Sequence, residues 1–146
     1  MNLCSRFFYF ILLLPFCLSH LRAQILTSSN LPIVVINTDN AHIPDEPKIL
    51  GTIGIIANDE GLPNHVSDPF NHYAGNIGIE TRGNSTQSFD KKTYSLETRT
   101  STDQDTSVSL LGMGVEEDWI LHAMVIDKSQ LRIPMSFYLF QQMGHY

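Results

Sequence analysis

A short stretch in the middle of this 146-residue chain carries side chains that could bind phosphate. Residues 82–86 read Arg-Gly-Asn-Ser-Thr, and Lys91 and Lys92 follow a few residues later. A glycine turn exposes backbone N–H groups, and a lysine on the next strand can neutralise an anion held there. The spacing is therefore consistent with a phosphate-binding turn, although small polar residues around a glycine more often only connect two strands.

Alternating side chains on both sides of the turn predict a β-hairpin over residues 75–96. Ile77 and Ile79 fall on one face of the first strand, which is the spacing of a strand with one buried face. On the return strand, Lys92 falls on the same face as Leu96. The turn and its cations should therefore project from the end of two paired strands.

The segments around the hairpin predict further strands. Runs of β-branched residues indicate strands over 31–37 and 49–57, and Gly51 and Gly54 mark places where a close approach to the backbone or a bend is expected. Apolar residues over 119–125 predict a short buried strand, with Trp119 as an anchor in the core. These elements predict a mostly β chain.

One helix is expected at the C-terminal end, within residues 128–143, which makes the fold class α+β. Asp127 or Ser129 can cap it. Pro134 favours a regular helix that starts at the proline itself, because proline fits the first helical position. Gly144 is expected to end the helix.

The long segment between the second strand and the hairpin, residues 58–73, is expected to cover another part of the protein or to have a function of its own. His65, Asp68 and His72 lie in it and could bind a metal ion. Their spacing fixes no coordination geometry, so solvated loop side chains are the favoured interpretation.

Residues 1–23 have the pattern of an export signal, with an apolar run over 7–18 and Ala23 before the cleavage point. The apolar run is shorter than the ~20 residues that span a bilayer, which disfavours the alternative of a membrane anchor. Both cysteines lie inside this signal, so residues 24–146 cannot form disulfides. Seven basic and 15 acidic residues remain there, a formal charge of −8, which argues against nucleic-acid binding. We expect a secreted, periplasmic or cell-surface bacterial protein with no stable membrane span after cleavage.

Five short blocks occur in an order that resembles the N-terminal part of the CotH kinase family, the spore-coat-type atypical protein kinases. The resemblance covers roughly residues 31–146. The blocks are Arg82 to Thr86 with Phe89, Lys91-Lys92-x-Tyr94, Leu110 to Met113, Glu117 to Leu121, and Asp127 to Arg132.

The resemblance implies the β-rich small lobe of a kinase-like fold, with ATP and magnesium as cofactors. The intact protein would transfer the ATP γ-phosphate to Ser or Thr of secreted or surface proteins. Lys91 or Lys92 would contact the phosphates, and Lys92 is favoured because it shares the face of Leu96, although alternation does not decide between them. The implied nucleotide-binding residues are Arg82, Gly83, Ser85, Lys91 and Lys92.

The resemblance also implies limits. The magnesium ligands and catalytic base are expected in a later part of the domain, so this stretch alone should be inactive. That later part should pack on the apolar face formed by Leu131, Met135 and Leu139. Two departures from the family pattern bear on the site: Asp90 stands where the family usually has proline, and Ile133 where it usually has asparagine.

Other interpretations stay open beside the kinase. Arg82 could form an ion pair with Glu80 or Glu97, and Asp127 could serve only as a helix cap. The whole chain could be a non-catalytic secreted β-rich module for binding or surface attachment, or a gene remnant.

Overall fold

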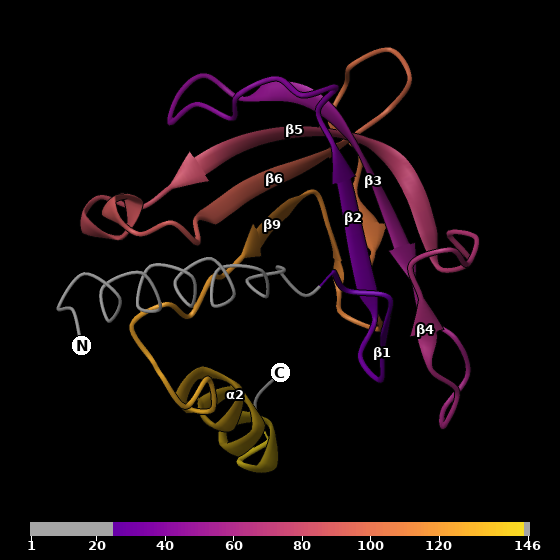
Figure 1. Cartoon of the computed structure of the whole chain (residues 1–146), viewed down its shortest axis with the longest axis vertical. Coiled ribbons are helices and arrows are strands. Elements are labelled where there is room, and N and C mark those ends of the chain that lie inside the picture. Colours follow the sequence, from indigo (N-terminus) through magenta and orange to yellow (C-terminus); the bar gives the residue numbers. More distant parts are fainter. Residues whose placement is uncertain (1–24, 145–146) are drawn as a thin grey trace, which may run out of the picture.

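The computed structural model describes residues 25–144, which are organised around one antiparallel sheet of five strands in the order β2-β3-β5-β6-β9 (Figure 1). The expected export signal, residues 1–23, lies outside the described residues. Each strand pairs with the next strand of the sheet along the chain. The strands are β2 Ile33–Asn37, β3 Ile49–Ile56, β5 Tyr73–Arg82, β6 Thr93–Arg99 and β9 Asp118–Leu121.

Smaller elements flank the sheet. Two short antiparallel pairs, one of β1 with β4 and one of β7 with β8, lie in the connections. The part of the chain that the structure describes is thus β-rich with one α-helix at its C-terminal end, which confirms the expected composition of the fold. The bounds are β1 Ser28–Ser29, β4 Asn64–His65, β7 Val108–Ser109, β8 Val115–Glu116, the 3-10 helix η2 Ser85–Ser88 and α2 Arg132–Gln142.

The core lies on one face of the sheet and follows the alternation of the hairpin. Ile77 and Ile79 of β5 are fully buried, and Leu96 of β6 pairs with Ile79. Ile53 and Ile55 of β3 and Leu110, which follows β7, complete this cluster. The prediction that the apolar side chains of 75–96 share a buried face is therefore confirmed.

The segment between β3 and β5 covers part of the opposite face, as its length suggested. The ring of Phe70 lies against Gly54, where a β-carbon would be 2.5 Å from the ring atoms. The amide of Asn71 and the backbone of Ala57 close the segment with a 2.8 Å hydrogen bond. The glycine at position 54 therefore allows this close approach.

The last strand is shorter and less buried than expected. β9 ends at Leu121, because Met124 adopts a φ of 48° and the N–H of Ala123 donates to Thr93 Oγ1. Trp119 packs against the core but is only half-buried, since β9 is the edge strand. The buried strand predicted over 119–125 is therefore wrong in its C-terminal half.

Helix α2 starts before the proline rather than at it. It begins at Arg132, and Pro134 occupies the third position, where a backbone N–H would have no partner within the helix in any case. Gly144 follows the helix with a φ of 82°, as expected for a terminating glycine. Within residues 25–144, neither helix has the length and apolar character needed to cross a membrane.

Candidate functional site

The turn of the β5–β6 hairpin is built around Gly83. The paired strands end where Arg82 lies opposite Thr93. Gly83 then adopts a φ of 109°, and a β-carbon there would collide with Thr86 Oγ1. Only glycine adopts this backbone conformation without strain. The tight turn expected at this position is present, and η2 follows it directly.

Hydrogen bonds brace the turn and use one of the two lysines. Gln87 Nε2 donates to the Gly83 carbonyl and, over 2.6 Å, to Asp45 Oδ1. Lys92 Nζ donates to the Gln87 carbonyl over 2.5 Å. Lys92 therefore braces the turn through one of its three N–H donors.

Two cations at the tip remain available. Arg82 and Lys91 are exposed, and no hydrogen bond or ion pair joins the side chain of either to another residue of the described range 25–144. The alternative in which Arg82 pairs with Glu80 or Glu97 is wrong, because the nearest cation to both glutamates is Lys48.

A groove of about 420 Å³ runs beside the lysines. Asp90, Lys91, Lys92 and Tyr94 line it on one side and residues 120–123 on the other. Its volume falls in the range of ligand pockets, about 300–1,000 Å³. The structure thus brings Lys91 and Lys92 together on one groove with the acid Asp90, whereas Arg82, Gly83 and Ser85 do not line it.

A charged network lies on the face of the sheet opposite the core cluster, which we call the open face. It contains residues that the sequence did not single out. Glu97 accepts from Lys48 Nζ and, over 2.8 Å, from Arg99, which also reaches Asp103 over 2.8 Å. Glu80 Oε1 lies 3.7 Å from Lys48 Nζ. No local pattern marks Lys48, because its partners come from strands that follow a long connection.

Within the network the pKa values of Glu97, Lys48 and Arg99 are shifted in the directions that favour charge. Hydrogen bonds from Arg99 and then Lys48 lower the pKa of Glu97. Burial alone would lower the pKa of Lys48, but its hydrogen bond to Glu97 and the nearby carboxylates outweigh burial and raise it. The cations of this face are therefore paired with carboxylates, and little positive charge is left to bind an anion.

Asp127 organises the start of α2. Its carboxylate accepts from the Ser129 hydroxyl over 2.7 Å and from the Arg132 N–H over 2.9 Å. The hydrogen bond from the Ser129 side chain, followed by that from the Arg132 backbone, lowers the pKa of Asp127. The N-cap residue is Leu131, without a side-chain cap, so the prediction that Asp127 or Ser129 is the cap is wrong in position, although Asp127 accepts the first N–H of the helix. A hollow of about 270 Å³ between Thr86 and this end of α2 brings the hairpin tip and the helix start together.

The histidines of the long segment form hydrogen bonds within the segment and to Leu111. His72 Nε2 accepts the N–H of Leu111 over 2.8 Å, and Asp68 accepts from the His65 N–H and from Asn58. Across residues 25–144 there is no cluster of three or more His, Cys, Asp or Glu that could hold a metal ion. The structure does not bring His65, Asp68 and His72 together as such a cluster.

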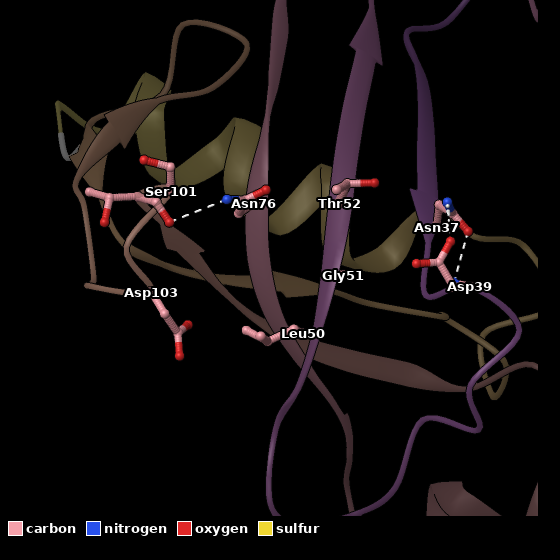
Figure 2. A pocket seen from close by; sticks show the side chains of 9 residues that line it. Asn37, Asp39, Leu50, Gly51, Thr52, Asn76, Ser101 and Asp103 are labelled. Atoms are coloured by element: carbon pink, nitrogen blue, oxygen red, sulfur yellow. Dashed lines mark hydrogen bonds between the residues drawn. The ribbon is translucent and has the colours of Figure 1, made fainter.

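A second hollow, of about 260 Å³, lies near the other end of the hairpin (Figure 2). Figure 2 shows Thr52 and Asn76 side by side on β3 and β5, with the amide of Asn76 donating to the Thr100 carbonyl over 3.2 Å. Asp39 and Asp103 stand at the rim. Its lining is polar and acidic, unlike the groove beside the lysines.

The C-terminal part of the chain, which contains this site, resembles a known protein family. Residues 79–146 match a family model described as CotH kinase protein. This match covers just under half of the chain and is consistent with a fragment of a CotH-family protein. The CotH match begins at Ile79 inside β5 and includes the Gly83 turn, both lysines, β9 and α2. It starts later than the resemblance from residue 31 suggested. No curated protein and no solved structure matches the chain.

Proposed function

We propose that this chain contributes the β-rich nucleotide-binding part of an exported CotH-type kinase, in which the hairpin tip binds the phosphates of ATP. The observation that carries the proposal is the pair of exposed cations, Arg82 and Lys91, within the family-matched segment. A five-stranded antiparallel sheet followed by a helix is consistent with the small lobe of a kinase-like fold.

Each residue of the tip has a distinct part in this proposal. Lys91 is the phosphate-contacting lysine in place of Lys92, because it lines the groove and its side chain has no partner within residues 25–144. Arg82 adds a second charge-assisted contact. Gly83 lets the backbone approach the phosphates, and Lys92 positions the turn through Gln87.

Bound ATP would supply the γ-phosphoryl group, and the acceptor would be a Ser or Thr hydroxyl of a secreted or surface protein. Phosphoryl transfer also needs magnesium ligands and a group that orients the acceptor. Since residues 25–144 hold no acidic cluster suited to a metal, they do not fit magnesium by themselves. We therefore assign nucleotide binding, not transfer, to this segment alone.

The exposed apolar side chains of α2 fit the same proposal. Met135 and Leu139 of α2, and Leu131 directly before it, are each more than half exposed. Apolar surface of this extent on one helix indicates a contact with further protein. The proposed partner is the remaining part of the kinase domain. The expected export signal at residues 1–23 would place the enzyme outside the cytoplasm.

Calorimetric titration of the protein, at its native length, with Mg-ATP tests the proposal. A charge-assisted hydrogen bond contributes about 1.5–3 kcal/mol, so Lys91→Ala should weaken binding roughly 10- to 100-fold. Lys128→Ala is a matched control, because Lys128 is also exposed and lies outside the groove. Unchanged affinity in the double variant of Arg82 and Lys91 would refute phosphate binding at the tip.

The polar hollow of Figure 2 favours one other function, a non-catalytic binding module. Its Asn76 lies six residues before Arg82 on β5, which is about 20 Å along a strand. A ligand bound in this hollow would not contact the hairpin tip. If Thr52→Tyr, which fills the hollow, abolishes a binding activity that the Arg82 and Lys91 variants retain, the module is the correct function.

A further inference from the structure

The edge strand β9 is open to a further strand. Among the described strands it pairs with β6 alone. The Glu117 carbonyl accepts the Thr98 N–H over 2.9 Å, so the backbone groups of residues 117, 119 and 121 face β6. Those of Asp118 and Ile120 therefore face outward. The Ile120 side chain, 52% exposed, stands in the middle of this edge.

The two ends of the edge carry opposite charges. Glu116, Glu117 and Asp118 stand at its start. Because Tyr94 pairs with Leu121 in an antiparallel ladder, the residues that precede Tyr94 run alongside the end of β9. The groove lining places Lys91 and Lys92 there, next to residues 121–123. Acids at one end and lysines at the other make the edge self-complementary.

We propose that β9 pairs antiparallel with β9 of a second copy of this chain, across a two-fold axis that passes near Ile120. The two Ile120 side chains then lie opposite each other, and Asp118 of each copy lies opposite His122 of the other. Cross-strand pairs of this kind stabilise a sheet. The acids of each copy face the lysines of the other, twice by symmetry. An isologous contact of this type closes as a dimer.

The surroundings of β9 leave room for the second copy. A hollow of about 470 Å³ lies between β9 and α2, lined by Ile120, His122, Ile133, Ser136 and Phe137. Figure 1 shows α2 on the β9 side of the sheet. With the groove beside the lysines, the edge thus has a hollow on each side, where alternate side chains of an added strand can lie. Because Lys91 takes part in this contact and in the proposed nucleotide site, the dimer and a bound nucleotide would compete for it.

Sedimentation velocity of the protein at its native length tests the dimer. We expect a concentration-dependent dimer, and Ile120→Lys should raise its dissociation constant at least 10-fold, because two lysines would meet at the axis. A half-exposed edge position tolerates lysine, so the variant should fold. Val34→Lys is the matched control, since Val34 is also exposed but lies on the opposite edge strand, β2.

Ile120→Pro provides a second variant. Its N–H faces outward, so proline removes no bond to β6 but blocks the added strand. Circular dichroism checks that both variants keep the sheet. A protein that stays monomeric at millimolar concentration would overturn the proposal. A dimer that survives both Ile120 variants, or one abolished by Val34→Lys, or a complex formed only with a different protein, would also overturn it.

Discussion

Replacing Glu97 by Gln tests whether the open-face network stabilises the sheet. Glu97 is the central acceptor, bonded to both Lys48 and Arg99. Their side chains are 18% exposed and that of Glu97 is 21% exposed, so water screens the network only in part. Gln keeps the size and one acceptor oxygen but removes the charge. The variant therefore reports the electrostatic part of the two contacts.

The magnitude follows from this intermediate exposure. Exposed ion pairs contribute about 0.2–1 kcal/mol, whereas hydrogen bonds to charged groups contribute about 1.5–3 kcal/mol. Two half-screened contacts, each partly replaced by the amide, should lower the free energy of unfolding by about 1–2 kcal/mol at neutral pH. For a domain of this size the melting temperature should fall by about 4–8 °C.

The pH dependence has a defined sign. Arg99 and Lys48 lower the pKa of folded Glu97, so its contribution is complete above the ordinary glutamate value of about 4.3. It is lost as the pH falls through the lowered folded pKa. At that acidic limit Glu97 is neutral in the wild type as well. The stability difference between wild type and Glu97→Gln should therefore shrink toward zero in acid.

Urea unfolding followed by circular dichroism, at neutral pH and in acid, measures both quantities. Glu60→Gln is the matched control, because Glu60 is exposed and outside the network. It should change stability by less than about 0.5 kcal/mol. A Glu97→Gln variant as stable as wild type at neutral pH would refute the reasoning, and so would a deficit that does not change with pH.

Three further changes test the turn, the core and the helix start. Gly83→Ala should destabilise by about 1–2 kcal/mol in urea because of its positive φ, whereas Gly114→Ala, in open space, should be nearly neutral. Leu96→Ala should cost about 2–5 kcal/mol by leaving a core cavity, whereas the exposed Leu50→Ala should cost under about 0.5 kcal/mol. Asp127→Asn should lower the ellipticity of α2 at neutral pH. The wild type should lose the same signal in acid, as the pH falls through the lowered pKa of Asp127. Equal ellipticity of variant and wild type at neutral pH would contradict the role of Asp127 at the helix start.

Structural features that depend only on residues close together in the sequence could be predicted. The alternation of Ile77 and Ile79 identified the buried face, and Gly54 marked the close approach of another segment. Gly144 ended the helix as expected. Each of these follows from the preference of one residue or from a period of two along one strand.

Features that depend on register between distant strands could not be predicted. Lys48 meets Glu97 only because Ile49 pairs with Ile79, and the long segment 57–72 between these strands leaves that register unspecified. The choice between Lys91 and Lys92 was left open by the sequence, and it stays a prediction. Alternation put Lys92 on the face of Leu96, and its ammonium group donates to the carbonyl of Gln87 in the turn.

The distribution of cations links the fold to the proposed function. In an acidic chain, an anionic ligand is attracted only where positive charge is left uncompensated. Lys48 and Arg99 are held by carboxylates on the open face, whereas Lys92 keeps its charge and donates to the neutral Gln87 carbonyl within the turn. The side chains of Arg82 and Lys91 are left without partners inside the described range, at the end of the hairpin that Gly83 lets close tightly. The sheet thus neutralises its cations at one end and exposes them at the other, which is the arrangement that phosphate binding at the tip requires.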